Sequence, residues 1–215
     1  MASKFIQWKN EELLEGLSSP VVIAAFEGWN DAGEAATSAV KYFQDRFDAV
    51  KIGTIESEEF FDFTISRPVI EIPDEQREII WPATKIYVAK MFESKNDLVI
   101  IRGHEPQLRW RTFTDQIIEI ASIIESHMVV TLGSLLTDIP HSRPVKVFGS
   151  SDDSDLAQRL NLPPSTYEGP TGIVGVINSV LREKRIPSMS LWAGVPSYVS
   201  GANSPKAALA LVERL

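Results

Sequence analysis

The 215-residue sequence has no cysteine, only three histidines and fewer basic than acidic side chains. Without cysteine the chain can form neither disulfides, thiolate metal ligands nor cysteine nucleophiles. Its formal net charge of −8 opposes sequence-independent binding to nucleic acid, because two polyanions repel each other. No apolar run reaches the roughly 18 residues of a membrane-spanning helix, and no secretory stretch opens the chain. We expect a cytoplasmic protein that contacts neither membrane nor nucleic acid.

Several kinds of catalytic site are also missing. The histidines, His104, His127 and His141, lack the i, i+4 spacing of a zinc hydrolase, and no Gly-x-Ser-x-Gly elbow occurs. The segment from Gly28 to Gly33 has the glycines of a phosphate loop, but Glu34 and Ala35 follow where such a loop needs Lys and Ser or Thr. We therefore expect no metal, no cofactor and no nucleoside triphosphate site.

The length and the alternation of apolar patterns favour a single α/β domain over residues 1–215. The continuous apolar run at 21–26 is typical of a strand that helices cover on both faces, and a hairpin around 73–77 adds antiparallel pairing, so the sheet should be mixed. Further strands are expected at 49–56, 60–65, 69–72, 78–81, 84–91, 98–102, 128–133, 145–149 and 188–195. Helices are expected at 30–46, 112–127, 153–160, 172–183 and 204–215.

The turn after the first buried strand contains Glu27, Trp29, Asn30 and Asp31. One interpretation is structural: Asn30 and Asp31 cap the next helix, and Asp31 and Glu34 lie in its first turn, where acidic side chains interact favourably with the helix dipole. The other is functional, because α/β sheets bind ligands at the carboxyl ends of their strands. Glu27, Trp29 and Asn30 would then form the rim of a site.

Two more polar loops are candidates for the same cleft. In Arg102-Gly-His-Glu-Pro106, His104 could act as a general acid or base oriented by Glu105, and Arg102 could bind an anion. The rigid loop Asp138-Ile-Pro-His-Ser-Arg-Pro144 offers Asp138, His141 and Arg143. The alternative is that both loops have only a structural role, because charged side chains in loops commonly form ion pairs with one another, and such pairs contribute little to stability.

The segment Gly169-Pro-Thr-Gly-Ile-Val-Gly175 opens an expected helix and carries little acidic charge. Thr171 could cap the helix, and the free backbone N–H groups near Thr171 and Gly172 could bind a carboxylate or a phosphate. The alternative is that these glycines only allow close packing of helix on strand.

Taken together, six segments resemble the bacterial branch of the proteasome assembly chaperone family. They are Phe26-Glu-Gly-Trp-Asn-Asp-Ala-Gly33, Arg102-Gly-His-Glu-Pro106, Asp138-Ile-Pro-His-Ser-Arg-Pro144, Gly169-Pro-Thr-Gly-Ile-Val-Gly175, Ser190-Leu-Trp-Ala-Gly-Val-Pro196 and Ser204-Pro-Lys-Ala-Ala207. The resemblance implies a three-layer α/β sandwich similar to the phosphorylase and peptidyl-hydrolase fold, often assembled into oligomers, with no established catalytic residues. Eukaryotic and archaeal relatives help to assemble proteasome α-rings.

Two functions remain open. The first is a non-enzymatic protein-binding or assembly factor that forms a homo-oligomer, with a trimer as the expected state and the 69–81 hairpin, including Trp81, and Trp110 as the expected interface. The second is a small-molecule-binding protein or a hydrolase- or phosphorylase-like enzyme that uses the cleft. The chain ends Val212-Glu-Arg-Leu215 rather than in the hydrophobic-Tyr-any tail of docking chaperones, and we expect it to lack a C-terminal helical segment of bacterial members.

Overall fold

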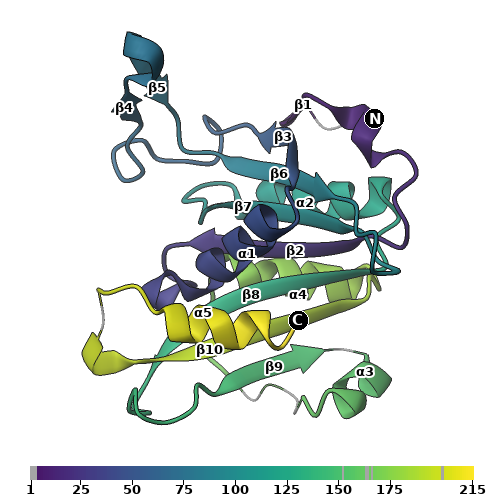
Figure 1. The fold of residues 1–215 in the computed structure, drawn as a ribbon, viewed down its shortest axis with the longest axis vertical. Coiled ribbons are helices and arrows are strands. Elements are labelled where there is room, and N and C mark those ends of the chain that lie inside the picture. Colours follow the sequence, from purple (N-terminus) through teal and green to yellow (C-terminus); the bar gives the residue numbers. More distant parts are fainter. Residues whose placement is uncertain (1–3, 152, 163–164, 166, 200) are drawn as a thin grey trace.

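The computed structural model describes residues 4–151, 153–162, 165, 167–199 and 201–215. An eight-stranded sheet with helices on both faces makes up the body, and a small two-stranded sheet stands apart from it (Figure 1). The strands are β1 (Ile6–Trp8), β2 (Val21–Glu27), β3 (Val50–Ile55), β4 (Val69–Glu71), β5 (Glu78–Ile80), β6 (Thr84–Ala89), β7 (Leu98–His104), β8 (Met128–Thr137), β9 (Val147–Ser151) and β10 (Ser188–Pro196). The α-helices are α1 (Ala35–Arg46), α2 (Trp110–Ile123), α3 (Ser154–Arg159), α4 (Ile173–Glu183) and α5 (Pro205–Val212). Short 3₁₀ helices are η1 (Glu11–Leu14), η2 (Ala32–Glu34), η3 (Pro73–Glu75) and η4 (Ser197–Val199).

The large sheet has the strand order β1-β3-β6-β7-β2-β8-β10-β9. Its centre is parallel, because β2 pairs in parallel with both β7 and β8, and β10 pairs in parallel with β8. Antiparallel strands complete both edges, with β9 on one side and β6, β3 and β1 on the other. The expected α/β sandwich with a mixed sheet is therefore confirmed.

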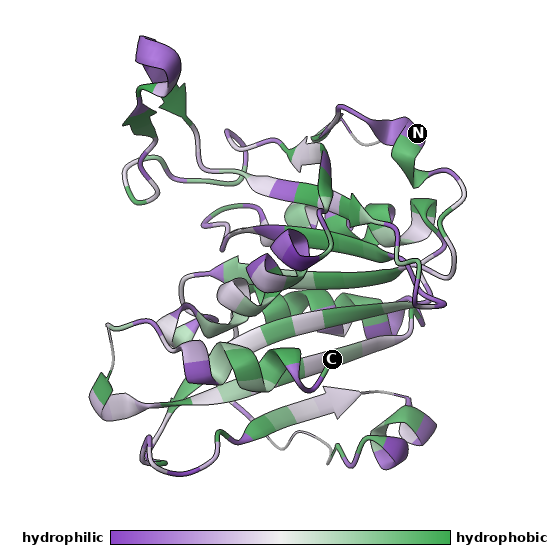
Figure 2. Ribbon diagram, in the orientation of Figure 1, coloured by the Kyte–Doolittle hydropathy of each residue, from purple (hydrophilic) through white to green (hydrophobic). Residues whose placement is uncertain are grey.

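Strand β2 explains why the sheet is covered on both faces. Val22, Ala24 and Phe26 point to the face that carries α2 and α4. The intervening Ile23 and Ala25 point to the face that carries α1 and α5. Because neither face of this strand meets water, its sequence is continuously apolar instead of alternating. Figure 2 shows the same result as hydrophobic colouring along the central strands.

The helices that follow β2 and β7 lie on opposite faces of the sheet: α1 covers one face and α2 covers the other. The chain therefore diverges where these two neighbouring parallel strands end. Glu27 and His104, the last residues of β2 and β7, are register partners at this edge. In α/β sheets such a divergence at the carboxyl ends of parallel strands is where ligands bind.

The predicted strand at 60–65 is wrong, since this segment forms turns. Phe60 and Phe61 are buried in the core, and their backbone N–H groups donate to the Ser57 carbonyl. The Asp62 carboxylate then accepts from the backbone N–H and the hydroxyl of Thr64. An apolar run can therefore be buried from a loop as well as from a strand, and the local hydrogen bonds decide in favour of turns.

The start of the helix predicted at 30–46 also differs. A 3₁₀ turn over Ala32–Glu34 precedes α1, which begins at Ala35. The buried Asp31, not Asn30, accepts hydrogen bonds from the first α1 amides, at 2.7 Å from Ala36 N and 3.3 Å from Thr37 N. Ser134 of β8 donates its hydroxyl to the same carboxylate at 3.1 Å. Asp31 thus caps α1 and connects it to the sheet.

The predicted hairpin is present as β4 and β5, joined by η3. It projects from one end of the body (Figure 1). Register partners Ile70 and Ile79 are 52% and 57% exposed, an unusual setting for isoleucine pairs. Figure 2 shows both strands coloured as hydrophobic even though they stand clear of the sheet.

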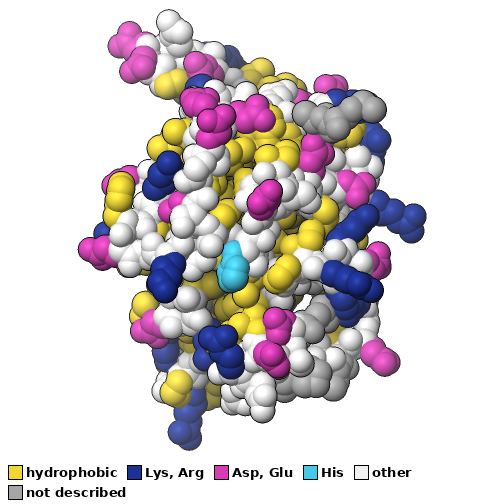
Figure 3. Space-filling view, turned by 90° about the vertical axis from the view of Figure 1, so that its right-hand side faces the viewer, with side chains coloured by type: hydrophobic (Ala, Val, Ile, Leu, Met, Phe, Trp, Pro, Cys, Tyr) yellow, Lys and Arg dark blue, Asp and Glu magenta, His cyan; other side chains and the backbone are white. Residues whose placement is uncertain are grey.

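Figure 3 shows the side of the molecule that lies at the right in Figure 1, where β8 begins after the exposed His127. Acidic and basic side chains are intermixed with apolar ones on this side. Among the described residues, no helix is both long and apolar enough to cross a bilayer.

Candidate functional site

The centre of the candidate site is an ion pair between the ends of two parallel strands. The His104 Nδ1 atom lies 2.9 Å from Glu27 Oε2, and both side chains are part-exposed. The alternation of β2 and β7 places Glu27, Arg102 and His104 on one face of the sheet, the face that carries α1. The sequence prediction that Glu105 orients His104 is wrong, because the orienting carboxylate is Glu27.

The pair changes the proton affinity of both groups. The hydrogen bond from His104 lowers the pKa of Glu27, although partial burial opposes this. The same hydrogen bond raises the pKa of His104 above its usual range, again against the effect of burial. Since Nδ1 donates to Glu27, the second ring nitrogen, Nε2, is the one left to exchange protons with a ligand.

A cavity of about 160 Å³ opens beside this pair. Most of its charged lining comes from the sheet, with Lys85 of β6 and Arg102 of β7 next to Glu27 and His104. The remaining lining residues are Arg67, Val69, Ile80, Trp81, Pro82, Ala83 and Gly103, which come mainly from the hairpin and the segment after it. Gly103 is required here, because a Cβ would lie 2.7 Å from the Thr84 Cα and 2.9 Å from the Ala83 carbonyl oxygen.

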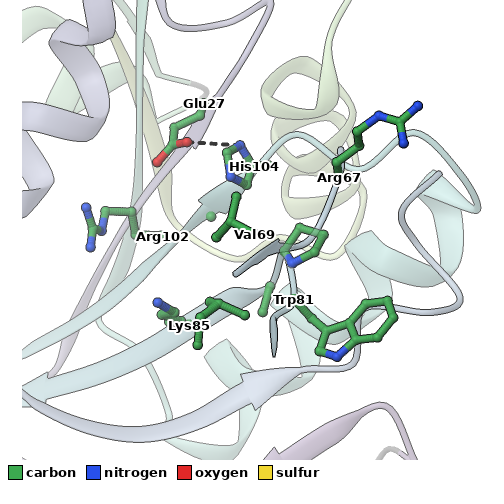
Figure 4. Close-up of a pocket in the computed structure, with 11 residues that line it drawn as sticks. Glu27, Arg67, Val69, Trp81, Lys85, Arg102 and His104 are labelled. Carbon is green, nitrogen blue, oxygen red and sulfur yellow. Dashed lines mark ion pairs between the residues drawn. The ribbon is translucent and has the colours of Figure 1, made fainter. Parts of the chain in front are cut away.

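Figure 4 shows how these side chains lie. Glu27, Arg102 and Lys85 are on the sheet side of the cavity, and Trp81 is on the hairpin side. Lys85 and Arg102 are direct cross-strand partners in the antiparallel pair of β6 and β7. Two cations therefore face the cavity from adjacent positions.

Asn30 and Glu105 form a separate cluster with the start of α4. The Asn30 side-chain amide donates to Glu105 Oε1 at 2.6 Å, and the backbone N–H of Ile173 donates to the same oxygen at 2.8 Å. The predicted anion position at the α4 terminus is thus filled by a carboxylate of the chain itself. Thr171 does not cap the helix: the N-cap residue is Gly172, and the capping oxygen comes from Glu105.

The loop with Asp138, His141 and Arg143 lies elsewhere. His141 and Arg143 line a second cavity of about 70 Å³, together with residues from the end of β10 and the start of α5. The Tyr198 hydroxyl lies 2.6 Å from His141 Nδ1, and Lys206 donates to the carbonyl oxygens of His141 and Arg143 at 2.7 and 2.8 Å. Asp138 is 3.5 Å from the Ser197 hydroxyl. The four polar loops therefore do not meet in one cleft.

Within the described part of the chain, no three His, Asp or Glu side chains come close enough together to hold a metal ion. Trp29, at 62% exposed, lines neither cavity. The interface candidates differ in setting: Trp81 is 49% exposed, whereas Trp110 packs partly buried on the core and donates its ring N–H to the Pro106 carbonyl at 2.6 Å.

The PAC2 family model matches residues 25–215, nearly the whole chain. The chain belongs to the PAC2 family. This PAC2 protein is 43% identical to a PAC2 family protein of Streptomyces avermitilis, over 91% of this chain and 83% of that one, with a TM-score of 0.87. It is also 43% identical to a Mycobacterium tuberculosis proteasome-assembly chaperone homologue, over 90% of this chain and 83% of that one, with a TM-score of 0.83. The resemblance inferred from the six motifs is confirmed.

A more distant structure shares the fold of the PAC2 protein. An archaeal proteasome activator of Pyrococcus furiosus is 14% identical over 97% of this chain and 86% of that one, with a TM-score of 0.77. A comparison with curated proteins finds no match to the chain.

Sequence reasoning missed two charged residues of the PAC2 protein's main cavity, Lys85 and Arg67. The sequence does distinguish Lys85, because a lysine between Thr84 and Ile86 interrupts an otherwise apolar strand. The alternation of the strand then places this side chain on the less covered face of β6. The pairing of Lys85 with Arg102 could not be predicted from the sequence, because it depends on β6 and β7 lying side by side.

Proposed function

We propose that this PAC2 protein is a non-enzymatic, cytoplasmic protein-binding factor that assists the assembly of a multi-subunit complex and works as a homo-oligomer. Membership of the family and the 43% identity to a mycobacterial proteasome-assembly chaperone homologue support a chaperone-like role. Proteasome ring subunits of the same host are the first partner to test.

The observation that carries the proposal is the outer face of the β4–β5 hairpin. Register partners Val69 and Ile80 line the main cavity, so alternation puts Ile70 and Ile79 on the other face of the ribbon. Ile72, which follows β4, is 68% exposed. An isolated two-stranded hairpin is marginally stable in water, so covering this face with protein would stabilise it.

A second copy of the chain is the occupant that this hairpin fits. Around the isoleucines the ribbon carries four acidic side chains, Glu71, Asp74, Glu75 and Glu78, and the basic Arg77, all exposed. Two hairpins that meet can therefore bury their apolar residues against each other, while the acidic side chains stay at the rim, where solvent screens their repulsion. Such self-complementarity is what a symmetric interface requires.

The lining of the main cavity supports a binding rather than a covalent catalytic role. Its described residues include the acid–base pair Glu27 and His104 but no serine, threonine or cysteine. An acyl-transfer hydrolase needs such a nucleophile within hydrogen-bond reach of the base.

Reconstitution tests the assembly role. The protein is added to separately purified proteasome ring subunits of its host, and ring formation is followed over time by native mass spectrometry. We expect faster ring formation and a transient complex that contains this protein. An Ile70→Lys, Ile79→Lys variant should lose the effect, whereas an exposed Lys41→Gln variant in α1 should keep it. Unchanged ring formation, with no complex at any time, would overturn the assignment to proteasome assembly.

A further inference from the structure

The main cavity has unbalanced positive charge on its sheet side. Lys85 and Arg102 lie directly opposite each other across β6 and β7, an arrangement that costs free energy because like charges repel. Neither side chain makes a hydrogen bond or an ion pair with any other described residue. The nearest carboxylate, Glu27, is already engaged by His104 at 2.9 Å. Glu27 also attracts Lys85 and Arg102, but its single negative charge is shared with His104, so the cationic pair has no counter-ion of its own among the described residues.

The positive charge continues across the open face of the sheet. Lys51 of β3 has a lowered pKa, first because it is partly buried and then because Lys85 and Lys9 repel its proton. In a chain of net charge −8, this local excess of cations stands out from the rest of the molecule. It attracts anions to the side of the sheet on which the cavity opens.

The hairpin side of the cavity is apolar. Val69, Ile80 and Trp81 contribute to this wall, and the Trp81 ring is held by Phe63 at a centroid distance of 4.8 Å. In Figure 4 the Trp81 ring lies across the cavity from Lys85 and Arg102, and the Arg67 guanidinium points away from that pair. The cavity thus has a cationic end and an apolar end.

We propose that this cavity binds a carboxylate that is carried on a short apolar group. Lys85 and Arg102 hold the carboxylate, because a guanidinium and an ammonium make charge-assisted hydrogen bonds to its oxygens. Val69 and Trp81 contact the apolar group.

Size and charge both favour this ligand class. A volume of about 160 Å³ admits a group of the size of one large amino-acid side chain and not a nucleotide. The excess of cations favours an anion, and the apolar wall favours an anion that is carried on an apolar group over free phosphate. The carboxylate can belong to a free small acid or to the last residue of a peptide, since the two present the same chemistry.

The ligand site is independent of the assembly role. The residues proposed for oligomer contact, Ile70 and Ile79, lie on the opposite face of the ribbon from Val69 and Ile80. Ligand binding can therefore be measured on the Ile70→Lys, Ile79→Lys variant as well as on the native chain.

Calorimetric titration with 3-phenylpropanoate and with its neutral amide is the first test. We expect the acid to bind at least tenfold more tightly than the amide, and inorganic phosphate to bind more weakly than the acid. In ¹⁵N NMR spectra the acid should shift the Trp81 indole N–H, assigned with a Trp81→Phe variant. Equal affinity for acid and amide, tighter binding of phosphate, or no binding of the acid would overturn the proposal.

Variants then locate the carboxylate. Lys85→Gln and Arg102→Gln should each weaken binding of the acid about tenfold, as expected for the loss of one charge-assisted hydrogen bond. Lys41→Gln, on a helix of the same face and paired with Asp45, should leave it unchanged. Native affinity in both cavity variants would place the ligand elsewhere and contradict the proposal. If one of these two variants does not fold, the affinity of the other variant and the comparison of acid with amide still test the proposal.

Two further arms identify the source of the carboxylate. An N-acetylated peptide that ends in Phe is compared with the same peptide amidated at its C-terminus. Tighter binding of the free-acid peptide than of 3-phenylpropanoate supports a peptide terminus as the natural ligand, whereas binding of 3-phenylpropanoate alone supports a free small acid. Equal binding of the two peptides, together with equal binding of acid and amide, would contradict carboxylate recognition altogether.

Discussion

The Glu105 carboxylate occupies the amino end of α4, where its Oε1 atom accepts the backbone N–H of Ile173 at 2.8 Å. The same oxygen accepts the Asn30 side-chain amide at 2.6 Å. One carboxylate therefore connects the turn after β2, the end of β7 and the first residue of α4. This carboxylate supplies the negative charge at the glycine-rich start of α4, so the helix end does not require an external anion.

Replacing Glu105 should destabilise this junction. In Glu105→Ala both donors lose their acceptor in a part-buried setting, and we expect the free energy of unfolding to fall by about 1–3 kcal/mol. Glu105→Gln keeps an oxygen acceptor and should cost less. The exposed Glu93→Ala serves as the matched control and should change little. Urea denaturation followed by circular dichroism measures all three, and a loss no larger for Glu105→Ala than for the control would contradict the bridging role.

Gly172 should tolerate no side chain while that bridge is intact. A Cβ at this position would lie 2.2 Å from Asn30 Oδ1 and 2.7 Å from Glu105 Oε1. The φ of −96° is accessible to any residue, so the expected cost of Gly172→Ala is steric. In a Glu105→Ala background Asn30 can move away, and the cost should shrink. A double-mutant cycle of unfolding free energies checks this, and strictly additive losses would speak against the proposed contact.

The Glu27–His104 pair should make stability depend on pH. The raised pKa of His104 adds stability that is complete below its unfolded value near 6.5 and is lost as the pH rises through the folded pKa. The lowered pKa of Glu27 adds stability above its unfolded value near 4.5 that is lost as the pH falls through the folded pKa. Both contributions are present between these two values. Because the side chains are part-exposed, we expect only about 0.2–1 kcal/mol.

Glu27→Gln provides the measurement for this pair. The variant should lower the pKa of His104 in an NMR titration of its ring protons. Its loss of unfolding free energy, relative to the native chain, should be larger at pH 5.5 than at pH 8.5. An unchanged His104 pKa, or a loss that grows with pH, would show that the two side chains do not interact in solution.

The sequence predicted the parts of the fold that local patterns determine. The apolar run of β2 required helices on both faces, and turn residues around Pro73 required a hairpin, as found. The segment at 60–65 failed because Phe60 and Phe61 enter the core from turns that Ser57 and Asp62 stabilise. Alternation alone does not distinguish these two ways of burying aromatic side chains.

The candidate site was predicted less well, because it depends on how distant strands pair. Glu27 and His104 were both named, yet their contact follows from the parallel register of β2 and β7. The Asp138 loop was expected nearby, but β8 continues to Thr137 and pairs with β10 to its end, which carries the loop to a different cavity. His104 and Glu105 are adjacent in sequence and still belong to different clusters, since Glu105 turns toward α4.

The molar mass of the protein in solution, from light scattering during gel filtration, tests the central claim most directly. If the outer face of the hairpin joins copies of the chain, the native protein should elute at a multiple of the 23.9 kDa monomer. The Ile70→Lys, Ile79→Lys variant should shift to the monomer mass while its circular dichroism spectrum stays native. A native chain that is monomeric at micromolar concentration, or a variant that keeps the oligomer mass, would contradict the account.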